Sequence, residues 1–158
     1  MKKSERRGQF VVDDDDRAIV AQLREDGRRS FTTIASALGK SEGMVRNRVA
    51  RLIEEGVLSI HAVVNPEALG YHTQASIGVM VDPPLIEQVA QELLNHEEVS
   101  YLAWTSGRLD LLVQVVCRDN EHFIEFFKKL NQIEGVRSTE TNIILHTFRQ
   151  SAAWEIPR

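Results

Sequence analysis

The sequence predicts an α+β protein in which three short helices precede a four-stranded antiparallel sheet with two helices. Apolar residues recur at helical spacing in three segments between residues 13 and 55, and from Thr73 the spacing changes to the alternation of a strand. The charge divides the chain as well. Residues 1–61 hold 12 of the 19 Lys and Arg and 10 of the 23 Asp and Glu, a net +2, which leaves 7 against 13, or −6, for the remainder. We therefore expect two modules, of which only the first meets a polyanion.

The first helix is expected to begin at an acidic segment, residues 13–16, and to end near Asp26 and Gly27. Four carboxylates at a helix start are favourable because they oppose the positive end of the helix dipole. A metal-binding acidic cluster is the alternative interpretation, but the segment has no spaced partner ligands. Residues 1–12 are predicted to form a mobile N-terminal tail.

Two further helices follow, joined by a tight turn. Ser30 is placed as the N-cap of a helix over residues 31–38, and Gly39 suits the left-handed position after its end. Ser41 then caps a second helix that runs to about Glu55, where Gly56 ends it. The three helices form one unit, and each has one apolar face to bury.

The helix that follows Ser41 has two different faces. Val45, Val49 and Leu52 form one apolar stripe with Ile53 beside it. The other side carries an amide, a guanidinium and small residues, with two more arginines on its flanks: Gly43, Met44, Arg46, Asn47, Arg48, Ala50 and Arg51. Asn and Arg can read base edges in a major groove, and flanking Arg can contact phosphates.

A helix with apolar and basic faces is more often a solvated surface helix, so the charge count decides between the two interpretations. From Arg28 to Arg51 the chain has six basic residues and one acidic residue, Glu42. This favours a helix-turn-helix that binds DNA. The residues predicted to contact DNA are Arg28, Ser30, Thr32, Lys40, Ser41, Glu42, Gly43, Met44, Arg46, Asn47, Arg48 and Arg51.

Composition excludes several other classes. No apolar run approaches the roughly 20 residues of a membrane span, and the first residues have no apolar signal-peptide core. The single cysteine, Cys117, excludes an internal disulfide and a Cys-based zinc site, and its apolar surroundings predict a core position. We therefore expect a cytoplasmic protein with no membrane partner.

A change of pattern near residues 60–66 predicts the domain boundary. Residues 57–64 are rich in β-formers and are expected to form a strand, as in a winged helix-turn-helix, or a linker. Asn65 and Pro66 end this stretch, and Gly70 marks another turn. We predict a helix-turn-helix domain over residues 13–60, a linker or hinge over 61–72, and a second domain over 73–158.

The second domain is predicted to be ferredoxin-like, with the order β-α-β-β-α-β. Strands are expected over residues 73–81, 99–105, 109–117 and 136–148, and helices over 85–94 and around the phenylalanines 123, 126 and 127. A weak repeat of the helix-to-strand junction, His96 to Val99 and Ile133 to Val136, supports this order. Both helices should cover one face of the sheet. The other face is expected to expose Ile and Val, which a second copy of the chain would cover.

Six short motifs, in this order and spacing, give the chain a resemblance to a known family. They are D-x-x-x-I-V-x-x-L-x-x-D-G-R at 15–28, I-A-x-x-L-G-x-S at 34–41, R-V-x-R-L-x-x-E-G-V-L at 48–58, N-P-E-A-L-G at 65–70, S-G-x-x-D-L-L at 106–112 and G-V-x-x-T-x-T at 135–141. From about Val12 to Phe148 the chain resembles the Lrp/AsnC family of bacterial and archaeal transcriptional regulators.

The resemblance implies a homodimer built on the C-terminal domains, often assembled into tetramers or octamers, and a small effector such as an amino acid. The effector would lie between subunits near the turn between the second and third strands. Gly107 there would allow close approach of the backbone, and Asp110 would hold the ligand's ammonium. The implied effector residues are Trp104, Thr105, Ser106, Gly107, Arg108, Asp110, Thr139, Thr141 and Asn142. Each also has an ordinary structural interpretation, as a turn, edge or packing residue.

Two positions depart from the family pattern. Arg108 stands where an acidic residue is frequent, so it would change the ligand, form a salt bridge with an acidic neighbour, or indicate that no ligand is used. Lys40 replaces the leucine that usually precedes the capping serine, which removes an apolar contact and adds a charge near the DNA backbone.

Two other functions share this architecture. Siroheme decarboxylases use histidine and arginine, but His61, His72, His96, His122 and His146 are scattered here and form no close pair in the sequence. A DNA-compacting architectural protein with little sequence preference is the third interpretation. No Ser-His-Asp signature, Gly-rich phosphate loop or spaced metal-ligand set is visible. We expect a regulator and not an enzyme, with no cofactor and no metal.

Overall fold

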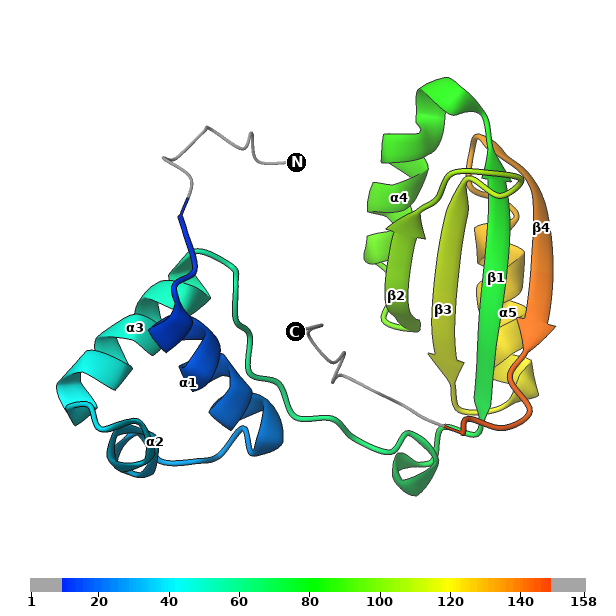
Figure 1. The fold of residues 1–158 in the computed structure, drawn as a ribbon. Coiled ribbons are helices and arrows are strands. Elements are labelled where there is room, and N and C mark those ends of the chain that lie inside the picture. Colours follow the sequence, from blue (N-terminus) through cyan, green and yellow to red (C-terminus); the bar gives the residue numbers. More distant parts are fainter. Residues whose placement is uncertain (1–9, 149–158) are drawn as a thin grey trace. The chain divides into compact units, whose positions relative to one another are not determined.

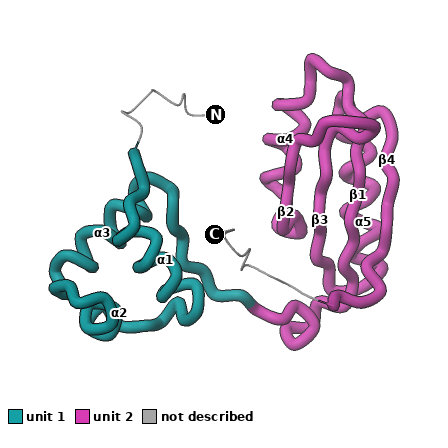
Figure 2. Tube along the Cα trace, in the orientation of Figure 1, with its two compact units in different colours: residues 1–63, 152–158 teal, residues 64–151 magenta. Residues whose placement is uncertain are grey.

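The computed structural model describes residues 10–148 and divides the chain into two compact units, with the boundary between Val63 and Val64 (Figures 1 and 2). The predicted linker, residues 61–72, spans this boundary. Most of the predicted N-terminal tail lies outside the described residues. None of the helices within residues 10–148 combines the length and apolarity that a bilayer crossing requires.

The first unit consists of three helices, as predicted: α1 (Asp14–Glu25), α2 (Phe31–Leu38) and α3 (Glu42–Glu54). The predicted caps are confirmed. Ser30 Oγ accepts the Thr33 N–H at 3.1 Å, Ser41 Oγ accepts the Met44 N–H at 3.3 Å, and Gly39 has a φ of 64°. Each helix contributes two residues to one core, namely Ile19, Leu23, Ile34, Ala35, Val45 and Val49.

The acidic segment caps α1, which confirms its predicted place at the helix start. Asp13 is the N-cap, and its Oδ1 accepts the Asp16 N–H at 2.9 Å. In return Asp16 Oδ2 accepts the Asp13 N–H at 3.2 Å, which completes a reciprocal capping box. Asp16 is fully buried.

Residues 57–64 form no strand, so the structure has no wing at this position. The β-formers Val57, Ile60, Val63 and Val64 are exposed. A strand requires a partner strand, and residues 10–63 of the first unit contain helices but no strand. Despite their high β-propensity, residues 57–64 therefore form a linker, which is the second of the two predicted possibilities.

The second unit has the predicted β-α-β-β-α-β order. Its elements are β1 (Thr73–Val81), α4 (Ile86–Leu94), β2 (Val99–Trp104), β3 (Leu111–Cys117), α5 (Asn120–Leu130) and β4 (Val136–Ile143). The strands form one antiparallel sheet in the order β2-β3-β1-β4 (Figure 1). One-turn 3₁₀ helices at Glu67–Leu69 and Pro83–Leu85 precede β1 and α4.

Three strand boundaries differ from the prediction, and one of them, the end of β2 at Trp104, differs by a single residue. β4 ends at Ile143, which pairs with Ala75 of β1, and not at residue 148. Beyond that pair only the Ile144 N–H continues the pattern, to the Gln74 carbonyl at 2.9 Å. β3 begins at Leu111, not at Leu109, because residues 105–110 fold back as a turn.

The sheet buries one face against α4 and α5. Ala75, Ile77, Val79 and Val81 of β1 are fully buried, and they pack with Val89 and Leu93 of α4 and Phe126 and Leu130 of α5. The phenylalanines are therefore core residues, as predicted. Cys117 belongs to the same core, and burial raises the pKa of its thiol to about 11.

The opposite face, called here the open face, is more polar than predicted. Its residues follow from the register, since directly paired residues point to the same side. They are Gln74, Ser76, Gly78 and Met80 of β1, Leu112, Gln114 and Val116 of β3, Tyr101 and Ala103 of β2, and Ser138, Glu140 and Asn142 of β4. Strict alternation places nearly all Ile and Val on the helix side, so the expected Ile- and Val-rich open face is wrong.

The turn between β2 and β3, residues 105–110, folds over the open face toward β1 (Figure 1). The Asp110 N–H donates to the Val79 carbonyl at 3.0 Å, and the Thr105 N–H donates to the Asp110 carbonyl at 2.9 Å. A Cβ added at Gly78 would lie 2.2 Å from Cδ1 of Leu109. Gly78 is thus a glycine because the turn packs directly on its backbone.

We predict that Gly78→Ala destabilises the second unit by roughly 1–3 kcal/mol, because the new methyl overpacks against Leu109. Denaturant unfolding measures this change, with Ser76→Ala on the same face as the control. In a Leu109→Ala background the cost of Gly78→Ala should largely disappear. An equal cost in both backgrounds would contradict the contact.

Candidate DNA interface and effector site

Helix α3 presents the two faces that the sequence predicts. Val45, Val49 and Leu52 are buried in one stripe, whereas Gly43, Asn47 and Ala50 are exposed on the other side. Ser30 and Ser41 fix the starts of α2 and α3, so they shape the turn between the helices. The exposed side has the polarity and small residues that a helix in a major groove requires.

A hollow of about 570 Å³ lies on this side of α3, lined by Asp13, Met44, Asn47, Arg48 and Arg51. Among the described residues no side-chain hydrogen bond engages the Asn47 amide, so its donor and acceptor remain available for a base edge.

Arg48 is not a free cation. Its Nη1 lies 2.7 Å from Asp13 Oδ2 and 2.8 Å from Asp16 Oδ1, and its Nη2 lies 3.6 Å from Asp15. Hydrogen bonds to Asp13 and Asp16 raise the pKa of the Arg48 guanidinium. The pKa of Asp13 is lowered, first by the hydrogen bond from the Asp16 backbone and then by Arg48. Arg48 therefore joins α3 to the start of α1.

The acidic segment also engages the two other cations that face it. Lys40 Nζ lies 2.9 Å from Asp15, and Arg51 Nη2 lies 3.4 Å from Asp16. The Arg51 guanidinium further stacks over the Phe10 ring, 4.5 Å from its centroid. We name Lys40, Arg48, Arg51 and residues 13–16 together the α1–α3 charge network.

Arg46 is paired within its own helix. It forms an ion pair with Glu42 and lies over the Phe31 ring, 5.4 Å from its centroid. Thr32 Oγ1 donates to Glu42 at 2.7 Å, and hydrogen bonds from Thr32 and Arg46 lower the pKa of the Glu42 carboxyl. Of the six basic residues in the linear count, only Arg28 lacks a carboxylate within 4 Å among residues 10–148; Arg29 pairs with Glu25.

The excess of basic residues counted between Arg28 and Arg51 is therefore largely neutralised in the folded chain. The fold brings the carboxylates of Asp13, Asp15 and Asp16, which lie outside this window, against three of the window's cations. Sequence separation hid this network: Asp13 and Arg48 are 35 positions apart. The acidic run itself was the available signal, because a buried or half-buried carboxylate needs a cationic partner.

The residues implied for an effector fall into two groups. Around the turn, Ser106, Gly107 and Arg108 are exposed, and Trp104 is 67% exposed. Thr105 Oγ1 donates to the Leu109 carbonyl at 2.6 Å. Arg108 pairs with Glu140 across the open face, so the salt bridge is the one of its three alternatives that the structure contains.

Asp110 is partly used by its own chain. Its Oδ2 accepts the Val81 N–H at 2.8 Å and lies 3.5 Å from Arg137 Nη2. The carboxylate thus ties the turn to the end of β1, at the register shift between Met80 and Val81. Only part of its hydrogen-bonding capacity remains for a ligand ammonium.

The last-strand residues do not all join this turn within one chain. Asn142 pairs with Ser76 and shares the open face. Thr139 and Thr141 instead pair with the buried Val79 and Ile77, so they face the helix side. Thr139 Oγ1 lies 3.4 Å from Asn131 at the end of α5, and Thr141 Oγ1 is buried without a partner.

Two histidines that looked scattered in the sequence converge on one buried carboxylate. His122 Nε2 lies 3.1 Å and His96 Nδ1 lies 3.9 Å from Glu98, which is 6% exposed. Burial raises the pKa of Glu98, but its hydrogen bonds, including that to His122, outweigh this and lower it. The fold therefore brings two histidines that lie far apart in the sequence to the same carboxylate. Within residues 10–148 no group of three acidic, His or Cys side chains is placed to hold a metal.

Comparison with known proteins agrees with this architecture. The model of the AsnC-type helix-turn-helix domain matches residues 12–53, and that of the Lrp/AsnC ligand binding domain matches residues 74–154. The chain belongs to the Lrp/AsnC family. It is an Lrp/AsnC-type transcriptional regulator, and its α+β fold is that of this family.

Relatives within the Lrp/AsnC family cover most of the chain. An uncharacterised HTH-type transcriptional regulator of Pyrococcus abyssi is 40% identical over 135 residues, covering 84% of this chain and 85% of that protein. The regulator LrpA of Pyrococcus horikoshii is 33% identical, covering 88% and 100%. A feast or famine regulatory protein of M. tuberculosis, solved in complex with L-methionine, is 30% identical with a TM-score of 0.84, covering 93% and 100%.

We predict that Arg48→Met destabilises the helix-turn-helix unit of this Lrp/AsnC regulator by roughly 1–3 kcal/mol, because it leaves the buried Asp16 short of its main cation. Arg46→Met, which removes an exposed pair within one helix, should change stability little. Denaturant unfolding compares the two variants. Equal unfolding midpoints for both would contradict the structural role of Arg48.

Proposed function

We propose that this regulator binds operator DNA with α3 in the major groove, reading bases chiefly through Asn47, with Met44 and the small Gly43 allowing close approach. The exposed Asn47 on the face opposite the buried Val45–Val49–Leu52 stripe carries this proposal. Arg28, Thr32 and Arg46 supply phosphate contacts from the flanks. Lys40, Arg48 and Arg51 act mainly by orienting α3 through the α1–α3 charge network.

We predict that Asn47→Ala weakens binding to an operator by about 10- to 100-fold, because a bidentate amide–base contact is lost. The operator is first obtained by selection from random DNA with the wild-type chain. Gel-shift titration then compares the variant with Asn95→Ala, the same change in the second unit. Unchanged operator affinity for Asn47→Ala would refute the proposed base contact of Asn47.

The α1–α3 charge network also bears on the architectural alternative. A protein that compacts DNA without sequence preference relies on uncompensated cations that release many counterions. Here carboxylates already compensate most cations near α3, which favours sequence-specific binding. A salt titration tests this: equal affinity and equal salt slope for operator and random DNA would favour the architectural protein. We propose that the chain acts by binding, without catalysis, in the cytoplasm.

We further propose that the chain forms a homodimer through the open face, with dimers assembling into a tetramer or octamer. The open face carries Tyr101, which is 50% exposed, together with the apolar Met80, Leu112 and Val116. Its other residues are mostly polar. Such a mixture is typical of an interface between identical copies. Light scattering tests the proposal, and a monomer mass at micromolar concentration would contradict it.

The effector is proposed to be an amino acid bound beside the β2–β3 turn. Gly107 and the surrounding turn backbone would accommodate the ligand carboxylate, and the free oxygen of Asp110 would accept its ammonium. The complex of the M. tuberculosis relative with L-methionine supports this class of ligand. Thr139 and Thr141, on the helix side of this chain, are left out of the proposed site.

We predict that Asp110→Asn reduces the rise in melting temperature caused by an effector amino acid while leaving DNA binding intact. The amide keeps an acceptor for the Val81 N–H but removes the charge that holds an ammonium. A thermal-shift series over the amino acids, L-methionine included, measures this, with Asp82→Asn as the control. An identical shift in Asp110→Asn and wild type would place the effector elsewhere.

A further inference from the structure

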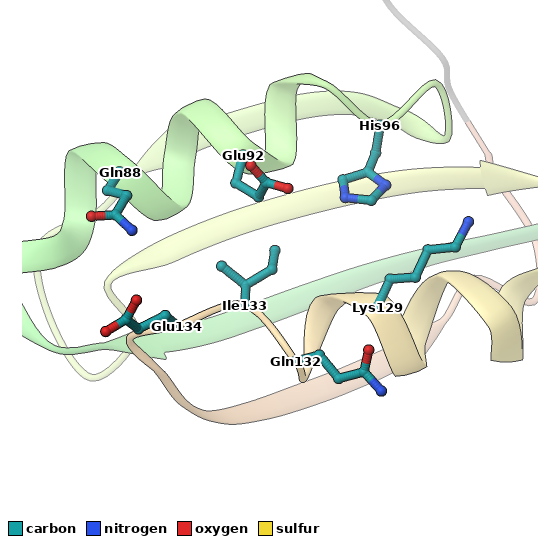
Figure 3. A pocket seen from close by; sticks show the side chains of 7 residues that line it. All are labelled: Gln88, Glu92, His96, Lys129, Gln132, Ile133 and Glu134. Carbon is teal, nitrogen blue, oxygen red and sulfur yellow. The ribbon is translucent and has the colours of Figure 1, made fainter.

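A second polar hollow lies in the second unit, on the helix-covered side of the sheet (Figure 3). This groove has a volume of about 410 Å³ and shares no residue with the β2–β3 turn. Its lining comes from α4, from α5 and from the segments that follow them: Gln88, Glu92, His96, Lys129, Gln132, Ile133 and Glu134.

The groove has two chemically different ends. His96 and Lys129 lie together at one end, and Gln88 and Glu134 lie together at the other (Figure 3). Glu92 and the apolar Ile133 lie between them. Gln88 and Glu92 are one helical turn apart on α4, which spaces their backbones by about 6 Å.

The charged side chains that line the groove do not form ion pairs with one another. Within the described part of the chain, Glu92, Lys129 and Glu134 have no ion-pair partner within 4 Å, although all three line the same hollow. The α1–α3 charge network is the contrast, since its cations are paired. The side chains of Glu92, Lys129 and Glu134 are all exposed, so a ligand that enters the hollow would replace water at both the carboxylates and the ammonium.

The His96 ring is packed on the side that faces away from the groove. It lies edge-on against Phe126, with centroids 5.5 Å apart, and its Nδ1 lies 3.9 Å from the buried Glu98. With Nδ1 on the side of Glu98, Nε2 is available to a partner in the groove. A side chain held in this way loses little entropy on binding.

We propose that this groove binds a basic amino acid such as L-lysine or L-arginine, at a site separate from the one beside the β2–β3 turn. The ligand's α-carboxylate lies against Lys129 and His96, and its α-ammonium faces Glu92. The side-chain cation reaches Glu134 and Gln88 at the far end, with the aliphatic stem over Ile133. Two carboxylates against one lysine give the groove a net charge of −1 with His96 neutral, which the additional cation of the ligand balances.

Isothermal titration calorimetry of the full chain with L-lysine and with L-arginine tests the proposal. L-Norleucine, which has the stem of lysine without its terminal ammonium, should bind at least about tenfold more weakly, because one charge-assisted contact is lost. Glu134→Gln and Lys129→Gln should each weaken L-lysine binding by a similar factor. The matched controls are Glu87→Gln on α4 and Lys128→Gln on α5, exposed residues outside the groove, and both should bind as wild type does.

Several outcomes would overturn the proposal. These are no binding of either basic amino acid, equal binding of L-norleucine and L-lysine, or unchanged L-lysine binding in Glu134→Gln. Loss of L-lysine binding in Asp110→Asn but not in Glu134→Gln would assign the ligand to the β2–β3 turn instead. Asn47→Ala should still bind L-lysine, so failure of the DNA-binding proposal and failure of this one are distinguishable. Circular dichroism melting confirms that each variant is folded.

Discussion

The DNA-binding unit depends on the buried carboxylate of Asp16. It closes the capping box of α1 with Asp13 and accepts one hydrogen bond each from Arg48 and Arg51 of α3, so one side chain fixes both a helix start and a helix-to-helix contact. A fully buried carboxylate is tolerated only with such partners, because removing them leaves a desolvated charge. The angle at which α3 presents Asn47 therefore follows from electrostatics as well as from the shared apolar core.

The second unit obeys a different constraint, the two-residue period of its central strand. Every odd position of β1 from Thr73 to Val81 is buried, whereas the even positions face the open side. Gly78 leaves space there for Leu109, and Asp110 fastens the same turn to β1. The proposed effector site and the proposed subunit interface thus share one surface, which gives a ligand at the turn a direct way to change subunit contacts.

The two units differ in whether their clustered charged side chains form ion pairs. Near α3, carboxylates from a distant part of the sequence compensate most of the cations, which is in keeping with the proposal that the exposed Asn47 amide discriminates between base sequences. Between α4 and α5, charged side chains line one groove without pairing. Paired charges hold structural elements in a fixed orientation, whereas charges without an ion-pair partner around a hollow are available to a ligand. This difference separates the orienting role of Arg48 from the ligand-binding role proposed for Lys129 and Glu134.

Local patterns in the sequence determined the helices, the strand order and the two faces of α3, because caps and periodicity act over a few residues. They also determined the burial of Cys117 and of the phenylalanine stripe. Only the tertiary structure decided that Arg48 joins Asp13 and Asp16, that His96 and His122 meet at Glu98, and that residues 57–64 find no partner strand. These outcomes depend on which distant groups become neighbours, and spacing along the chain carries no information about such long-range pairs.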